Sequence, residues 1–155
     1  TYGDWSSDVC SSDLGTGSVL LRVLADGHTG RFGDEALEAL QSGPYVVGSD
    51  SSRVGFRLEG PRLRQTRGAE IASDVTTMGT LQVPGSEQPI LLMADRQTTG
   101  GYTRVASVIT ADLPSAAQAA PGDRLRFEVC SSEAARALLV EQDARFRSLT
   151  RLARG

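Results

Sequence analysis

Lysine is absent from this 155-residue sequence, and all sixteen of its basic side chains are arginines. The absence excludes a lysine nucleophile, a Schiff base and a biotinyl-lysine from these residues. Histidine is nearly absent as well, because His28 is the single one and no cysteine or acidic cluster lies near it in the sequence. Zinc or iron needs three or four ligands, so we expect no metal site.

Cysteine is also scarce. Cys10 and Cys130 are the only two, and at this separation they make neither a disulfide framework nor a zinc motif, so we interpret both as free thiols. No apolar run approaches the roughly 18 to 20 residues of a membrane span, and no signal peptide pattern opens the chain. The formal net charge of -3 gives no basis for binding nucleic acid. We therefore expect a cytoplasmic protein with neither a membrane nor a nucleic-acid partner.

Motifs for common cofactors and nucleophiles are missing too. The sequence has no Walker A pattern and no dinucleotide fingerprint, so we place no ATP site on this chain. Neither a Gly-x-Ser-x-Gly elbow nor a Ser-His-Asp arrangement is supported. His28 can still act as an acid or base, although a histidine in a Gly-His-Thr-Gly turn is more often simply exposed.

The length suits one domain with less ordered ends. Residues 1–17 are polar and serine-rich, and residues 1–14 resemble a translated sequencing adapter, so we predict a disordered artefact there and a true start further upstream. Residues 18–142 form the predicted domain. Residues 143–155 form an arginine-rich tail that we expect to be partly helical.

Short β-rich runs separated by glycine and proline turns dominate the middle of the chain. The expected strands are Val19–Leu24, Tyr45–Val47, Val54–Leu58, Gly79–Pro84, Ile90–Met93, Val105–Ile109 and Leu125–Val129. Helices are expected at Asp34–Leu40, after Asp112 and from Glu133 onward, and Arg62–Ser73 is expected to be a surface loop. This pattern predicts a mostly β barrel with short peripheral helices.

An abrupt change from apolar to polar residues marks the candidate site. Ile90–Met93 is an apolar run without alternation, typical of a strand buried on both faces. A carboxylate, a guanidinium, an amide and two hydroxyls then follow within five residues, from Asp95 to Thr99. Asp95 can be a general base, an orienting carboxylate or half of a structural ion pair. Gly100 and Gly101 can form an anion-binding nest with Thr98 and Thr99, although a Gly-Gly pair is more often only a turn.

Two other pairs of side chains can join this site. Arg53 and Arg57 flank Gly55 at alternate strand positions, so both guanidiniums can face one cleft and hold an anion. The simpler alternative is that both arginines are solvated at the surface. Gln82 and Gln97 can meet across a hairpin, where carboxamides complement a lactam or ureido group. Each glutamine is at least as well explained by a bond to a neighbouring backbone group.

Three motifs follow one another between about Leu21 and Cys130: Ser-Ser-Arg-Val-Gly-Phe-Arg-Leu-Glu-Gly-Pro, Gly-Thr-Leu-Gln-Val-Pro and Pro-Ile-Leu-Leu-Met-Ala-Asp-Arg-Gln-Thr-Thr-Gly-Gly-Tyr. Through these motifs, this part of the chain resembles a known family, the C-terminal half of the C subunit of 5-oxoprolinase, also called biotin-dependent carboxyltransferase or allophanate hydrolase subunit 2. This resemblance implies a cyclophilin-like β-barrel. The family's N-terminal half has no counterpart here.

The resemblance implies site residues and partners. The predicted catalytic residues are Asp95 and Gln97, and the predicted substrate-binding residues are Arg53, Arg57, Gln82, Thr98, Thr99, Gly100, Gly101, Tyr102 and His28. The expected activity is ATP-dependent hydrolysis of 5-oxoproline to glutamate with subunits like A and B, and ATP would bind to those partners. This chain alone is expected to bind no cofactor and to be inactive.

Two alternatives stay open. One is carboxyl transfer from carboxybiotin to urea or a related amide, and the other is a non-catalytic regulator of a kinase inhibitor. The paired arginines favour 5-oxoproline, because its carboxylate offers them a partner that urea and biotin lack at the reacting centre.

Overall fold

The computed structural model describes residues 17–33 and 35–152. In chain order the elements are β1 (Ser18–Ala25), the 3-10 helix η1 (Thr29–Arg31), α1 (Ala36–Gln41), β2 (Tyr45–Val47), β3 (Gly55–Glu59), β4 (Glu70–Val75), β5 (Thr80–Val83), β6 (Ile90–Leu92), β7 (Thr99–Val108), the 3-10 helix η2 (Thr110–Asp112), α2 (Leu113–Ala117), β8 (Arg124–Val129) and α3 (Ser132–Leu152). Predictions that concern residues 1–16, Asp34 and residues 153–155 lie outside the described residues.

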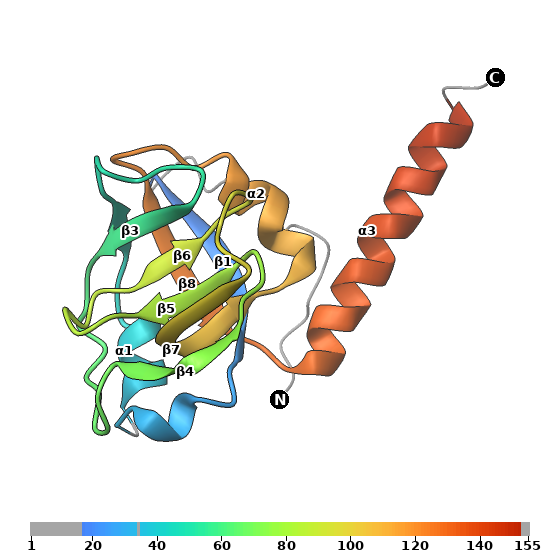
Figure 1. Ribbon diagram of the computed structural model, residues 1–155. Coiled ribbons are helices and arrows are strands. Elements are labelled where there is room, and N and C mark those ends of the chain that lie inside the picture. Colours follow the sequence, from blue (N-terminus) through green and yellow to red (C-terminus); the bar gives the residue numbers. More distant parts are fainter. Residues whose placement is uncertain (1–16, 34, 153–155) are drawn as a thin grey trace.

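Seven strands close into a barrel, which confirms the mostly β architecture (Figure 1). The order around it is β1, β8, β2, β3, β6, β5 and β7, and β7 pairs with β1 to complete the circle. β1 and β8 run parallel, whereas the other neighbours are antiparallel. β4 lies outside the closed circle because it pairs only with the first half of β7.

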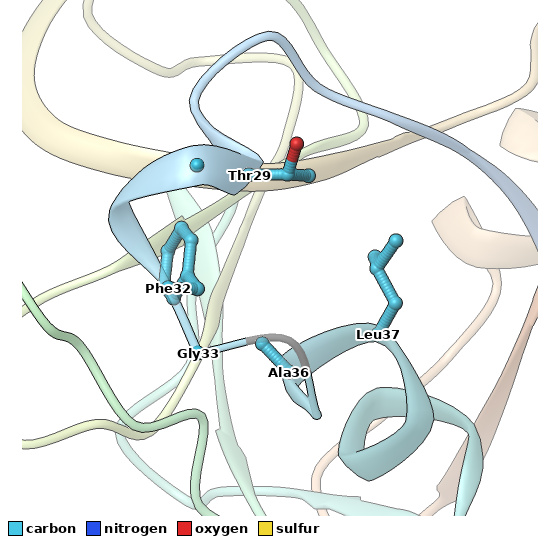
Figure 2. A pocket seen from close by; sticks show the side chains of 6 residues that line it. Thr29, Phe32, Gly33, Ala36 and Leu37 are labelled. Atoms are coloured by element: carbon cyan, nitrogen blue, oxygen red, sulfur yellow. The ribbon is translucent and has the colours of Figure 1, made fainter.

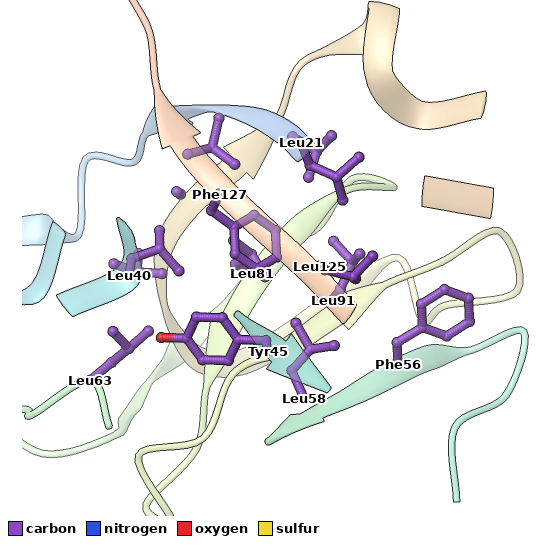
Figure 3. Packing of buried hydrophobic residues seen from close by; sticks show 14 of the residues in the cluster. Leu21, Leu40, Tyr45, Phe56, Leu58, Leu63, Leu81, Leu91, Leu125 and Phe127 are labelled. Atoms are coloured by element: carbon purple, nitrogen blue, oxygen red, sulfur yellow. The ribbon is translucent and has the colours of Figure 1, made fainter. Parts of the chain in front are cut away.

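Alternation within the strands explains which side chains fill the barrel. In β8, Leu125 and Phe127 are buried while Arg124 and Arg126 are exposed, as expected when successive side chains point to opposite faces. The same holds in β3, where Phe56 is buried. Figure 3 shows these apolar side chains meeting inside the barrel. The largest fully buried ones are Tyr45, Leu21, Leu40, Leu58, Leu63, Leu81, Leu91 and Leu125.

Tyr45 anchors one end of this core. Its ring lies edge-on to that of Phe127, with centroids 5.6 Å apart, and its hydroxyl donates to the Pro61 carbonyl at 2.8 Å. Burial raises the pKa of the Tyr45 hydroxyl. A Cβ at Gly60 would lie 2.6 Å from the Tyr45 ring, so glycine is needed there for close packing.

A buried ion pair fastens β1 to the segment before α2. The Arg22 guanidinium contacts both carboxylate oxygens of Asp112, at 2.9 and 2.5 Å, and the backbone N–H of Arg22 donates to the same group at 2.8 Å. The bond to Asp112 raises the pKa of Arg22. This three-bond contact fixes η2 against the barrel.

The helices lie outside the barrel wall. The Ser131 side chain accepts from the N–H of Ala134 at 3.1 Å and so caps the N-terminus of α3. α3 then runs without a break to Leu152, and it projects beyond the barrel (Figure 1). Within the described part of the chain, no helix is long and apolar enough to cross a membrane.

Four expectations from the sequence are wrong in detail: the number of strands, the loop over Arg62–Ser73, the Gly-Gly turn and the place of Arg53 on a strand. The described residues hold eight strands instead of about seven, because β4 occupies part of the expected loop Arg62–Ser73. Gly100 and Gly101 belong to β7 and not to a turn. Arg53 and Val54 precede β3, so Arg53 does not share that strand with Arg57. In each case backbone pairing with a distant strand decided the outcome, and local composition does not reveal it.

Candidate functional site

The loop between β6 and β7 presents Asp95 at the surface. Arg53 Nε lies 3.0 Å from Asp95 Oδ2, and the backbone N–H of Asp95 donates to the Arg53 carbonyl at 2.9 Å. The Arg53 side chain is 82% exposed and the Asp95 side chain 51%. Of the alternatives for Asp95, the structure shows the ion pair. The Asp95 carboxylate is still exposed to solvent within this pair.

Arg57 binds a different aspartate. Its Nε lies 3.1 Å from Asp50 Oδ2, and both side chains are largely exposed. Arg53 and Arg57 therefore do not converge on one group. Exposed ion pairs contribute only about 0 to 1 kcal/mol, so an incoming carboxylate can replace either aspartate at little cost. Their role in substrate binding stays a prediction.

Gln82 is the most deeply buried of the predicted site residues with a polar side chain. It lies on β5, only 6% of its surface is exposed, and its buried Nε2 has no hydrogen-bond partner among the described residues. Its carboxamide lies directly over Gly100 of β7, where an added Cβ would come 2.4 Å from Nε2. Leaving such a donor unpaired costs about 1 to 3 kcal/mol, and a cost of this kind is expected at functional sites.

Thr76, just after β4, connects this glutamine to the polar loop. Its Cγ2 would lie 3.1 Å from a Cβ on Gly100. Its hydroxyl donates to the Gln97 carbonyl, and its backbone N–H donates to the Thr98 carbonyl at 3.0 Å. The Gln97 side chain is exposed while that of Gln82 is buried, and the meeting of the two carboxamides across a hairpin stays a prediction.

The remaining predicted residues of this stretch lie along the start of β7. Thr98, Thr99 and Tyr102 are exposed. Thr99 and Gly100 pair with Val75 and Asp74 of β4, so the backbone of this stretch is part of a strand ladder. The expected anion-binding nest in a Gly-Gly turn is therefore wrong, because these residues are extended and paired.

A cluster of charged side chains lies at the middle of β7, between the residues that pair with β4 and those that pair with β1. Arg104 Nη2 lies 2.8 Å from Asp74 Oδ2, Nη1 donates to the Val75 carbonyl, and Nε lies 3.4 Å from Asp26 Oδ2. The last contact is an ion pair without hydrogen-bond geometry, so the buried Nε has no hydrogen-bond partner in the part of the chain that the structure describes. Both Arg104 and Asp26 are 17% exposed.

His28 lies against the same two aspartates. Its Nδ1 is 3.9 Å from Asp26 and its Nε2 is 3.9 Å from Asp74. Its backbone N–H donates to Asp26 Oδ1 at 3.1 Å. The structure thus places this predicted residue beside Arg104 and not in an isolated exposed turn. A three-residue 3-10 helix, η1, begins immediately after it.

The sequence interpretation missed four members of this site: Arg104, Asp26, Asp74 and Thr76. Arg104 carried a signal, because it is the single charged residue inside an otherwise uncharged strand from Thr99 to Val108. Asp74 and Thr76 were missed because they lie between the expected loop Arg62–Ser73 and the strand expected from Gly79, where no element was predicted. Only the pairing of β4 with β7 brings them to Gln82.

Two other features offer less chemistry. A hollow of about 280 Å³ lies between η1 and α1 (Figure 2), and its lining residues are Thr29, Gly30, Phe32, Gly33, Ala36 and Leu37. Burial raises the pKa of the Cys130 thiol, so it is protonated at neutral pH and a poor nucleophile. Among the described residues, no three acidic, histidine or cysteine side chains are arranged to hold a metal ion.

Comparison with known proteins places this barrel in a family. Residues 7–129 match the family described as the carboxyltransferase domain, subdomain A and B, and the chain belongs to it. It is 37% identical over 129 residues to the C subunit of 5-oxoprolinase from Escherichia coli K12, covering 83% of this chain and 42% of that protein. It is 31% identical over 127 residues to urea amidolyase of Saccharomyces cerevisiae, covering 76% and 7%. The chain thus spans less than half the length of these relatives.

Solved structures agree with this assignment. The urea carboxylase of Kluyveromyces lactis superimposes with a TM-score of 0.77 at 27% identity, covering 83% of this chain and 12% of that one. The protein TTHA0988 gives a TM-score of 0.62 at 38% identity, covering 72% and 22%. Both matches extend over most of the barrel, which confirms the fold and the family that the sequence predicts.

Proposed function

We propose that this chain supplies one wall of a small-amide site in a protein like the C subunit of 5-oxoprolinase. The proposed reaction is the ATP-dependent opening of 5-oxoproline to glutamate. Subunits like A and B would bind ATP and complete the enzyme. Two relatives that bear this name, from Escherichia coli and Haemophilus influenzae, support the choice at 37% and 44% identity.

The observation that carries the proposal is the buried carboxamide of Gln82. A primary amide offers a donor and an acceptor side by side, which complements the lactam of 5-oxoproline. Gln82 Nε2 is buried and unpartnered, and its neighbours Thr76 and Gly100 connect it to the exposed polar loop. A lactam carbonyl would satisfy this donor.

The roles proposed for the predicted catalytic residues, Asp95 and Gln97, follow from their position on the loop between β6 and β7. Asp95 is exposed enough to orient the amide nitrogen or a water molecule, and the Gln97 side chain, two residues further along the loop, is exposed as well. Arg53 or Arg57 would exchange an aspartate partner for the substrate carboxylate. These pairs are exposed and weak, so the exchange requires little energy.

Turnover tests the role of Asp95. In the full-length protein assembled with its partners, Asp95→Ala should lower kcat for 5-oxoproline by about 100-fold or more, as expected for loss of a general acid or base. Asp143→Ala is the matched control. Asp143 is also an exposed carboxylate, 57% accessible, with an arginine partner at 2.8 Å. Unchanged turnover in Asp95→Ala would contradict the role.

A second candidate function is carboxyl transfer to a urea-like amide. The TM-score of 0.77 with urea carboxylase favours it, and the Gln82 carboxamide would also complement a ureido group. The same assembly separates the two candidates. Glutamate formed from 5-oxoproline supports the first, whereas carboxyl transfer from carboxybiotin to urea without 5-oxoproline turnover supports the second.

A further inference from the structure

We propose that Gln82 and Arg104 together form a two-donor site for the carbonyl oxygen of a neutral amide. This inference rests on the proposed function, because it names the part of the substrate that each residue holds. The two donors would be Gln82 Nε2 and Arg104 Nε. Both atoms are buried, and neither has a hydrogen-bond partner among the described residues.

Strand register places the two side chains next to each other. Gln82 of β5 is paired with Arg104 of β7, and residues paired directly across antiparallel strands project from the same face of the sheet. Their tips also reach the same short stretch of chain. Gln82 Nε2 and Thr76 Cγ2 both lie close to the place that a Cβ on Gly100 would take, and Arg104 contacts Asp74 and the Val75 carbonyl.

Gly100 keeps the glutamine tip close to the backbone. Asp74 is paired with Gly100 across the β4–β7 ladder, so the segment that binds Arg104 also runs beside Gly100. A side chain at Gly100 would occupy the place of Gln82 Nε2. The glycine therefore leaves free the space beside β7 that the Gln82 carboxamide occupies.

The charge of the cluster selects a neutral ligand. Asp74 at 2.8 Å and Asp26 at 3.4 Å place two carboxylates against one guanidinium, with His28 as the remaining titratable neighbour. Asp26 and Asp74 already occupy the Arg104 guanidinium, so a carboxylate from a ligand would be a third and would have to displace one of them. A neutral carbonyl oxygen would accept from both donors instead.

The same arrangement suits catalysis on an amide. Negative charge develops on the carbonyl oxygen when an amide is attacked, and donors already aimed at that oxygen stabilise it. Asp26 and Asp74 hold the Arg104 guanidinium in a fixed orientation, so little reorganisation is needed as the charge appears. This differs from the site considered from the sequence, where Gly100 and Gly101 could form an anion-binding nest with Thr98 and Thr99.

Side-chain NMR of the ¹⁵N-labelled 155-residue chain tests binding directly. The probes are 2-pyrrolidinone as a neutral lactam, acetate as an anion and tetrahydrofuran as a ring without a carbonyl, each titrated to about 0.1 M, which detects binding of about 1.4 kcal/mol. We expect 2-pyrrolidinone to shift both the Gln82 NH₂ and the Arg104 Nε–H resonances, and the other two probes to shift neither. Gln82→Met and Arg104→Met assign the two signals.

Two results would overturn the carbonyl site. One is acetate shifting both resonances as strongly as 2-pyrrolidinone, which would indicate an anion site. The other is no shift of either resonance with 2-pyrrolidinone. Because these signals are measured in the unaltered chain, poor folding of a variant does not obscure the result.

Kinetics in the full assembly provide the second measurement. Gln82→Met and Arg104→Met should each lower kcat by about 100-fold to 1,000-fold, as when one oxyanion donor is removed. Gln65→Met is the control, because it removes a half-buried glutamine that donates to the Val83 carbonyl at 2.7 Å. Wild-type turnover in either donor variant would contradict a catalytic role. If the unaltered assembly hydrolyses no 5-oxoproline while 2-pyrrolidinone still shifts both resonances, the proposed function fails and the carbonyl site stands.

Discussion

At the scale of single residues, two adjacent glycines of the same strand have different surroundings. A Cβ at Gly100 would lie 2.4 Å from Gln82 Nε2 and 3.1 Å from Thr76 Cγ2, which is too close without movement. A Cβ at Gly101 would lie 3.6 Å from the Ile71 carbonyl oxygen, an ordinary contact. Only Gly100 is therefore required by packing.

We predict that Gly100→Ala lowers the free energy of unfolding by about 1 to 3 kcal/mol, as expected for overpacking. Gly101→Ala should change it by less than about 1 kcal/mol. Adding Gln82→Ala to Gly100→Ala should recover part of the loss, because the closest obstructing atom belongs to Gln82. Urea unfolding of the three variants measures this. Equal losses in Gly100→Ala and Gly101→Ala would argue against the Gln82–Gly100 contact.

At the scale of elements, α3 differs from the barrel strands in how little of it is covered. Ala135, Leu138 and Gln142 are half-buried, and the Gln142 side chain donates to the Ala111 carbonyl at 3.0 Å. Further along the same helix face, Phe146 is 61% exposed and Leu149 is 62% exposed. The second half of α3 therefore adds little apolar burial to the fold.

Replacing Phe146 and Leu149 together with glutamine should change the free energy of unfolding by no more than about 1 kcal/mol in total, as for exposed positions. Leu125→Ala, inside the barrel, should cost about 2 to 5 kcal/mol. Chemical denaturation of both variants makes the comparison. A loss in the double variant as large as that in Leu125→Ala would show that this helix face is packed.

At the scale of the whole molecule, alkaline stability depends on the buried end of the barrel. Because burial raises the pKa of Tyr45, the folded chain holds this proton more tightly than the unfolded chain does. The resulting contribution to stability is fully present below about pH 10, the ordinary tyrosine pKa, and is lost as the pH rises above it.

The free energy of unfolding should therefore fall above about pH 10 by up to about 1.4 kcal/mol per pH unit from this residue. Tyr45→Phe should be less stable at neutral pH by about 1 kcal/mol, because it loses the bond to the Pro61 carbonyl. Its alkaline slope should be shallower by the Tyr45 contribution. Urea unfolding between about pH 8 and pH 11 tests this, and identical slopes would contradict it.

The sequence by itself determined the barrel and the family. Alternating apolar residues such as Leu125 and Phe127 specify one buried face per strand, and glycine–proline turns separate the strands, so local pattern was sufficient. The run from Ile90 to Tyr102 also indicated the candidate site, whose role in binding stays a prediction. These properties depend on neighbours in the chain.

Tertiary structure alone decided which polar groups meet. Pairing of β4 with β7 removed Gly100 and Gly101 from the expected turn and brought Asp74 and Thr76 to the site. Pairing of β5 with β7 placed Gln82 beside Arg104, although 22 residues separate them in the chain. Such contacts arise from strand register, which closure of the barrel fixes and which the residues of one segment do not encode.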